Sequence, residues 1–167
     1  MSKPFVAIVM GSDSDLPVLE ASFDVLRTFE IPFEARITSA HRTPDVTKAY
    51  VVDADKRGCA VFIAAAGMAA HLAGAVAAAT VKPVIGVPMN ASLDGMDALL
   101  STVQMPAGIP VATVAIGKAG AKNAAYLAAQ MMSLADPQMV QKLRDERAAN
   151  AEAIYAKDAA LQDRLKG

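Results

Sequence analysis

Residues 60–80 of the chain read AVFIAAAGMAAHLAGAVAAAT, and this stretch decides the fold class. Its first part, residues 60–66, is a short apolar run with β-branched and aromatic residues near its centre, which predicts a strand buried on both faces. Its second part, residues 69–80, is rich in alanine and predicts a helix. A buried strand that leads into a helix is typical of a βα unit in a parallel sheet.

The same alternation of strand and helix recurs on both sides of this stretch. Further strands are predicted at Phe5–Met10, Phe33–Ile37, 84–87 and 111–116, and helices follow the first two and cover 123–134 and 137 to about 157. Thr43 is the predicted N-cap of the second helix, and Pro44 is its first residue. The pattern predicts an α/β fold: a three-layer αβα sandwich around a flavodoxin-like, doubly wound, parallel five-stranded sheet with a C-terminal helical extension. The expected strand order is 2-1-3-4-5.

The length of the chain, 167 residues and 17.3 kDa, suits one domain with a sizeable core. We therefore expect a single domain over residues 1–167, with an α/β core over 1–134. The C-terminal helix over 135–167 sets a few apolar residues, such as Ile154 and Leu161, among many charges. Such a helix covers little of its own core, so we expect it to contact another subunit.

Charge and hydropathy exclude some kinds of partner. The net charge of -1 and the pI near 6.1 argue against a nucleic-acid partner. Lys82 and Pro83 interrupt the most apolar region, so no membrane span is expected. The opening residues, MSKPFVAIVMG, lack the features of a signal peptide, and the lone cysteine, Cys59, cannot form an intramolecular disulfide. We expect a cytoplasmic protein.

Polar residues gather in the loops after the first three predicted strands. These loops meet at the carboxyl edge of the sheet, where the strand order reverses and ligands usually bind. Free amides and hydroxyls there could hold a phosphate, a carboxylate could hold ribose hydroxyls, and a histidine beside an arginine could move a proton on an anionic ligand. The simpler readings are helix capping and an Arg42–Asp45 pair. The residues concerned are Ser12, Ser14, Asp15, Ser39, His41, Arg42, Gly67 and His71.

Six motifs carry a family resemblance: MGSDSD, SAHRTP, AAGMAAHLAG, GVPM, VQMPAGIPV and AIGKAGAKNAA. In this order and at these spacings they resemble the class I PurE family of N5-carboxyaminoimidazole ribonucleotide mutases, over about residues 6–134. The resemblance implies an isomerase of de novo purine (IMP) biosynthesis that uses no cofactor and no metal. Its substrate would be a small ribonucleotide, N5-carboxyaminoimidazole ribonucleotide. Decarboxylation and recarboxylation would give 4-carboxyaminoimidazole ribonucleotide.

The resemblance also implies roles for particular residues. His41 would be the general acid and base. Ser12, Ser39 and Arg42 would hold the phosphate, Asp15 the ribose hydroxyls, and the backbone around Ala66 and Gly67 the migrating carboxylate, with His71 close by. The family forms a homo-octamer with active sites near subunit boundaries, so a homo-oligomer is expected here, with the Met105 loop helping to close a neighbour's site.

Some residues depart from the expected family pattern, and two other functions stay open. Ala65, Met68 and Ala73 replace two glycines and a proline, which would matter if the backbone there needs positive φ. One alternative is a carboxylase that uses CO2 directly on aminoimidazole ribonucleotide. That form is expected to carry lysine in place of Arg42 and to lack VQMPxGIPV. The other is a non-catalytic flavodoxin-like phosphate-binding module, which the low aromatic content disfavours if it were to hold a flavin.

Overall fold

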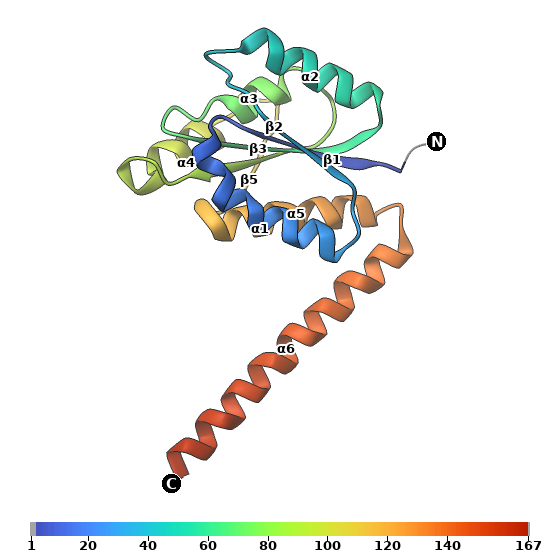
Figure 1. Ribbon diagram of the computed structural model, residues 1–167, viewed down its shortest axis with the longest axis vertical. Helices are drawn as coiled ribbons and strands as arrows, with labels where there is room; N and C mark the ends of the chain where they lie inside the picture. The colour runs from blue at the N-terminus through green and yellow to red at the C-terminus, as the bar shows by residue number, and fades with distance from the viewer. Residues whose placement is uncertain (1–2, 167) are drawn as a thin grey trace.

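The fold is built on a five-stranded sheet, seen in a computed structural model that describes residues 3–166 (Figure 1). All strand pairs are parallel, and the strand order is β2-β1-β3-β4-β5. The predicted order is therefore confirmed. The strands are β1 (Phe5–Met10), β2 (Phe33–Ile37), β3 (Cys59–Gly67), β4 (Val84–Met89) and β5 (Ala112–Thr113).

Helices cover both faces of the sheet, so the predicted three-layer sandwich is also confirmed (Figure 1). One face is covered by α1 (Leu16–Thr28) and α5 (Gly117–Ser133), and the other by α2 (Pro44–Lys56), α3 (Leu72–Ala77) and α4 (Met96–Val103). Strand β1 shows why a layer of helices is needed on each face of the sheet. Val6 and Ile8 belong to the core cluster under α1 and α5, whereas Ala7 and Val9 belong to the cluster under α2 and α3. Side chains of a strand alternate between faces, so an apolar residue at every position requires cover on both.

The C-terminal helix α6 (Pro137–Lys166) is longer than predicted and projects away from the sandwich (Figure 1). Its first turns are anchored: Met139 and Leu143 are buried, Lys142 pairs with Glu30, and the Tyr126 hydroxyl donates to Glu146. At 30 residues, the helix is about 45 Å long. Its second half is exposed.

Several predicted boundaries were wrong. The strand predicted over 111–116 contains only Ala112–Thr113, because β5 is an edge strand that pairs with β4 alone and gives way to α5 at Gly117. The helix predicted over 69–80 is limited to Leu72–Ala77, because the residues before it form a turn in which the His71 N–H donates to the Ala69 carbonyl. The helix predicted from residue 123 begins at Gly117, and α4 was not predicted at all.

Candidate active site

A cavity of about 520 Å³ lies at the carboxyl edge of the sheet, beside the paired strands β1 and β3, whose following connections lead in opposite directions, to β2 and to β4. Its volume is in the range of small-ligand sites. Its walls come from the loops after β1, β2 and β3, with one residue from the loop after β4. Every residue singled out from the sequence lines it: Ser12, Asp15, Ser39, His41, Arg42, Ala66, Gly67 and His71.

The loop after β1 folds as a short 3₁₀ turn, Asp13–Asp15, capped by Ser12. The Ser14 N–H donates to Ser12 Oγ at 3.2 Å, and the Ser12 N–H donates to Asp15 Oδ2 at 3.2 Å. The capping interpretation of this loop is thus correct, and the capped loop still lines the cavity. Burial raises the pKa of the Asp15 carboxyl above its ordinary value, against the opposing effect of the Ser12 N–H. Hydroxyl groups that donate hydrogen bonds to such a partly buried carboxylate stabilise its charged form.

The loop after β2 is held by hydroxyl groups. The oxygens Thr38 Oγ1 and Thr47 Oγ1 lie 2.6 Å apart in the buried layer under the loop. Thr43 occupies the N-cap position just before α2, but its side chain makes no capping hydrogen bond to the helix. Its Oγ1 instead accepts from the Ser39 N–H at 2.9 Å. The Arg42 N–H donates to Ser39 Oγ at 3.1 Å. These bonds fix the backbone that carries His41 and Arg42.

The Arg42 side chain ties this loop to the first one. Its Nη2 donates to the Gly11 carbonyl at 3.2 Å. Among the ion pairs of residues 3–166, none joins Arg42 to Asp45, so the simple pairing considered from the sequence is wrong. A guanidinium carries five N–H groups, and the bond to Gly11 leaves others for a ligand.

The loop after β3 is packed closely against the next loop. A Cβ placed on Gly67 would lie 2.8 Å from Ala91 Cβ, so only glycine fits there. Met68 adopts φ 56°, a left-handed conformation that costs a non-glycine residue about 1–2 kcal/mol. Ala65 and Ala73 lie in β3 and α3 and do not have positive φ. The concern about the replaced glycines therefore applies to Met68 alone.

His41 and His71 contact each other across the cavity. His41 Nε2 and His71 Nδ1 are 2.7 Å apart, and the ring centroids are 4.9 Å apart at an interplanar angle of 84°. His71 stands at the N-cap position of α3, but its side chain makes no capping hydrogen bond. The local capping interpretation of His71 is wrong, since its ring bonds to His41 instead.

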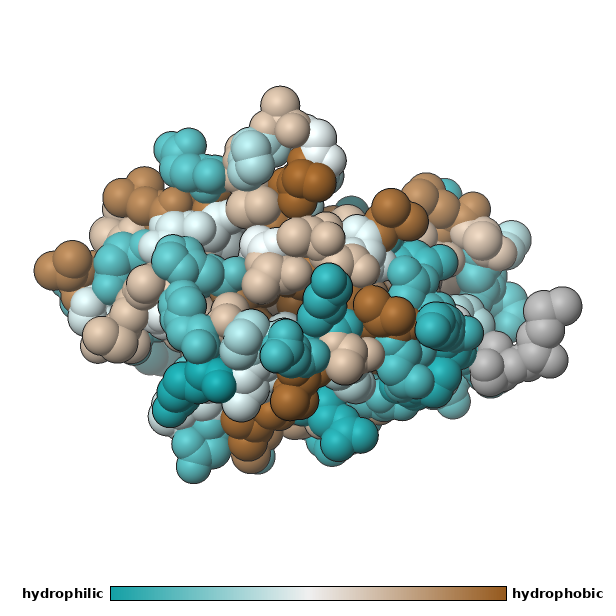
Figure 2. All heavy atoms as spheres, turned by 90° about the horizontal axis from the view of Figure 1, so that it is seen from above, coloured by the Kyte–Doolittle hydropathy of each residue, from teal (hydrophilic) through white to brown (hydrophobic). Residues whose placement is uncertain are grey.

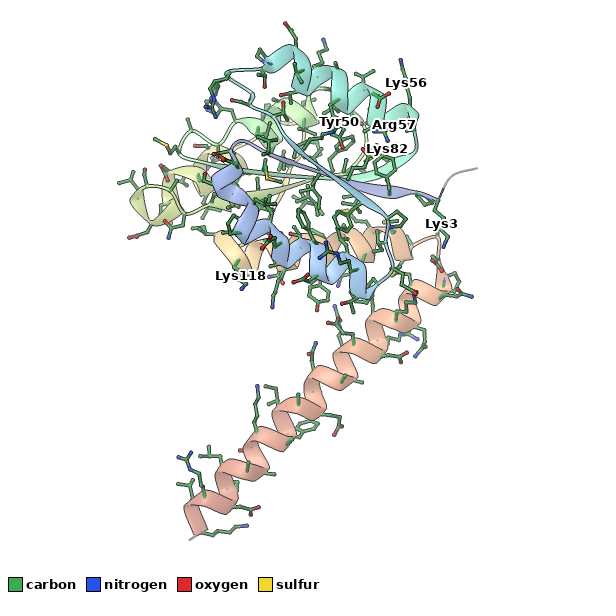
Figure 3. The ribbon with its side chains drawn as sticks, viewed as in Figure 1. Lys3, Tyr50, Lys56, Arg57, Lys82 and Lys118 are labelled. Carbon is green, nitrogen blue, oxygen red and sulfur yellow. The ribbon has the colours of Figure 1, made fainter. Side chains whose placement is uncertain are left out.

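The main basic cluster lies elsewhere. Figure 3 shows Lys3, Lys56, Arg57 and Lys82 on the side of the sheet where β1 begins, away from the loops of the cavity. Arg57 pairs with both Glu34 and Asp53, and Lys82 pairs with Asp55, so part of the charge of this cluster is neutralised. Of the described residues that line the cavity, Arg42 is the one lysine or arginine. An anionic ligand in the cavity would therefore meet one fixed positive charge.

Seven lining residues were given no role in the predicted site, namely Gly11, Ser14, Ala40, Met68, Ala69, Leu72 and Ala91. Ser14 was singled out as a polar loop residue but given no ligand role, although it shares the loop of Ser12 and its hydroxyl lies 2.9 Å from Ser12 Oγ. The alanines and Leu72 form an apolar wall and carry no chemical signal in the sequence. Over residues 3–166, no three His, Cys, Asp or Glu side chains gather as a metal site, and no helix there is long and apolar enough to cross a membrane.

Comparisons with known proteins agree on one family. A family model described as AIR carboxylase matches residues 5–153. An N5-carboxyaminoimidazole ribonucleotide mutase of Mycobacterium tuberculosis H37Rv is 52% identical over 166 residues, which cover 99% of this chain and 94% of the relative. A phosphoribosylaminoimidazole carboxylase of Saccharomyces cerevisiae is 50% identical over 97% of this chain but only 28% of its own length. The crystal structure of Treponema denticola PurE superposes with a TM-score of 0.86 at 32% identity, covering 95% of this chain and 99% of that one.

Proposed function

The chain belongs to the AIR carboxylase family, and from this premise we propose that it is an isomerase that converts N5-carboxyaminoimidazole ribonucleotide to 4-carboxyaminoimidazole ribonucleotide in de novo purine biosynthesis. The observation that carries this proposal is the single cavity into which three separate loops bring His41, Arg42, three serines and one carboxylate. The mutase name of the M. tuberculosis relative, which is aligned over nearly its whole length, supports it.

The substrate would lie across the three loops. Ser12, Ser39 and Arg42 would hold its phosphate through hydroxyls and a charge-assisted bond, and Asp15 would accept from the ribose hydroxyls. The backbone of Ala66 and Gly67 would hold the migrating carboxylate, with His71 beside it. The support for these roles is that the same residues line one cavity, with the phosphate ligands on the loops after β1 and β2 and the carboxylate ligands at the end of β3.

His41 would move the proton. As the bond between the exocyclic nitrogen and the carboxylate carbon breaks, that nitrogen gains a proton and CO2 is released into the cavity. Ring carbon four then attacks CO2, and the proton on this carbon is removed to restore the aromatic ring. The two transfers balance, so one residue near neutral pH can serve as acid first and base second. The apolar wall of alanines and Leu72 would help to retain CO2 and exclude water.

Direct carboxylation is the second candidate, because the S. cerevisiae relative is named as a carboxylase. Arg42 favours the mutase, since the direct carboxylase is expected to have lysine at this position. The deciding experiment supplies N5-carboxyaminoimidazole ribonucleotide without bicarbonate in one reaction, and aminoimidazole ribonucleotide with bicarbonate in another. We expect the mutase product to form rapidly in the first reaction. If 4-carboxyaminoimidazole ribonucleotide formed only in the second reaction, the enzyme would be the direct carboxylase. A flavodoxin-like flavin-binding module would instead be inactive in both and yellow.

Replacing Arg42 by alanine should weaken substrate binding more than it slows chemistry. A charge-assisted phosphate bond acts equally on the bound substrate and on the transition state, so its loss should raise KM about 10–100-fold, or about 1.5–3 kcal/mol, with kcat within about threefold. Steady-state kinetics measure both constants. Lys48→Ala, on the exposed side of α2, is the charge-matched control and should leave both unchanged. A loss confined to kcat would remove Arg42 from the phosphate site.

A homo-octamer is proposed as the working assembly, in the cytoplasm. Figure 2 shows apolar side chains reaching the surface among polar ones. The exposed large apolar residues include several on α4 and on the free half of α6. Monomers rarely leave such patches uncovered. Met105 itself lies against Gly74 of its own chain, so the exposed neighbours Gln104 and Pro106 would be the parts of that loop that reach another subunit.

The assembly is tested by light scattering behind a sizing column at micromolar concentration. We expect a mass of about eight chains for a closed octamer. Ile154→Lys should reduce this mass, because Ile154 is on the apolar side of α6, whereas Ala153→Lys adds the same charge on another side and should not. A fully active monomer, or an equal response of the two variants, would contradict the proposed role of α6.

A further inference from the structure

The bond between His41 Nε2 and His71 Nδ1 links the protonation of the two rings. Its length of 2.7 Å lies at the short end of the hydrogen-bond range. Such a bond needs an N–H on one ring and a lone pair on the other. When the pair is neutral, the tautomer of one ring therefore determines the tautomer of the other. Two imidazolium rings would point N–H groups at each other, so this contact accommodates at most one positive charge.

The backbone holds both rings in place for this contact. The His71 N–H donates to the Ala69 carbonyl at 2.8 Å, and the His71 carbonyl accepts from the Ala75 N–H at 2.9 Å, which fixes His71 at the start of α3. On the other side, the bonds of Ser39 to Thr43 and Arg42 fix the loop of His41. The pair is therefore preorganised by two elements rather than by chance contact of two long side chains.

Two other titratable groups face the same cavity. The titratable groups that line the cavity besides the two histidines are Asp15, on the loop after β1, and Arg42, next to His41 in the chain. The Arg42 Nη2 donates to the Gly11 carbonyl. Asp15 belongs to the capped turn and accepts from the Ser12 N–H.

We infer that His71 is a positioning residue that holds the His41 ring in one tautomer and orientation and shares its proton. This inference rests on the proposed function of His41. The bond exists whether the pair is neutral or carries one positive charge. With Nε2 held by His71, His41 Nδ1 is the nitrogen left to give a proton to the leaving nitrogen and take one back from ring carbon four, without the ring having to turn. The proton returned equals the proton lent, so the pair ends each turnover as it began.

The first test uses the resting protein and needs no substrate. The ¹⁵N chemical shifts of imidazole nitrogens report which nitrogen carries the proton. At neutral pH we expect unequal, fixed shifts for the two ring nitrogens of His41 in the unaltered chain. The His71→Phe variant should instead show averaged shifts of a free imidazole. Identical His41 shifts in both proteins would overturn the inference.

The second test is kinetic and compares three variants. In His71→Phe, kcat should fall about 10–100-fold, as is usual for loss of an orienting partner, with KM within about threefold. His71→Asn keeps a polar atom near the Nδ1 position, so its kcat should be at least tenfold higher than that of His71→Phe. Ser101→Ala is the control, because its hydroxyl contacts the Met68 carbonyl in the same loop without touching the pair. It should behave as the unaltered enzyme.

The outcomes separate this inference from the proposed function. Equal activity of the phenylalanine and asparagine variants would show that the hydrogen bond is irrelevant and would overturn the inference. If the unaltered chain shows no isomerase activity, the proposed function fails, and the ¹⁵N shifts alone then decide whether His71 orients His41. Should His71→Phe fold poorly by circular dichroism, His71→Ala, which also removes the hydrogen-bonding ring, supplies the same comparison of shifts and rates.

Discussion

The His41→Asn variant is expected to lose about 10²–10⁴-fold in turnover number while its affinity for the nucleotide stays within about tenfold. Asparagine keeps a polar group near the His41 position but cannot exchange a proton near neutral pH. The phosphate and ribose contacts proposed for the first two loops do not involve the imidazole. Single-turnover kinetics with N5-carboxyaminoimidazole ribonucleotide measure the chemical step, and titration calorimetry with the product measures the affinity.

The matched control for this variant is Asp45→Asn. Asp45 lies four residues further on, in the exposed first turn of α2, and does not line the cavity. It should retain turnover and affinity, which shows that the loop tolerates an amide nearby. Near-normal turnover in His41→Asn would exclude His41 as the acid and base. A large loss of affinity would instead place the imidazole among the binding groups.

The Gly120→Ala variant is expected to be the most destabilised single substitution proposed for this chain. A Cβ on Gly120 would lie 1.6 Å from the Ala115 carbonyl oxygen and 2.6 Å from its carbon. Both atoms are backbone of the segment between β5 and α5, so no side chain can move aside. Either this segment or α5 must shift, and α5 carries a row of buried alanines against α1 and the sheet.

We expect this substitution to reduce the free energy of unfolding by about 3 kcal/mol or more, at or beyond the upper end for overpacking. For a chain of this size, that corresponds to a fall in Tm of roughly 6–12 °C. Urea unfolding followed by circular dichroism measures it. Gly11→Ala is the control, because the nearest atom to its Cβ, apart from its chain neighbours, would be the Ala65 carbonyl oxygen at 4.0 Å. Equal destabilisation of the two variants would refute the steric argument.

Local pattern was enough to predict most of the sheet. The bounds of β1 and β2 agree with the prediction, because their apolar or alternating runs end at turn residues that mark both ends. The strand order followed from the repeated βα alternation and the handedness of crossovers. The same reasoning placed the three polar loops at one edge, which is why every predicted site residue lines the cavity.

Helix α4 was missed for a physical reason. Its large apolar residues, Met96, Leu100 and Val103, are exposed, whereas its buried residues are the small Ala98 and Thr102. Thr102 packs over Gly86, where a Cβ would lie 2.4 Å from Thr102 Cγ2. A search for large apolar residues on a buried face cannot find such a helix, because the close approach depends on a glycine in a distant strand.

The sequence by itself determined the fold class, the family and the chemical types of the site residues, because periodicity, turn residues and motif spacing are local properties of the chain. Only the tertiary structure decided which of these groups touch. The bond from Arg42 to Gly11 and the bond from His41 to His71 join residues that lie 31 and 30 positions apart. Such contacts depend on the exact path of two loops and on the turn that starts α3 one residue after His71. No local pattern encodes that path, since it results from the packing of helices on both faces of the sheet.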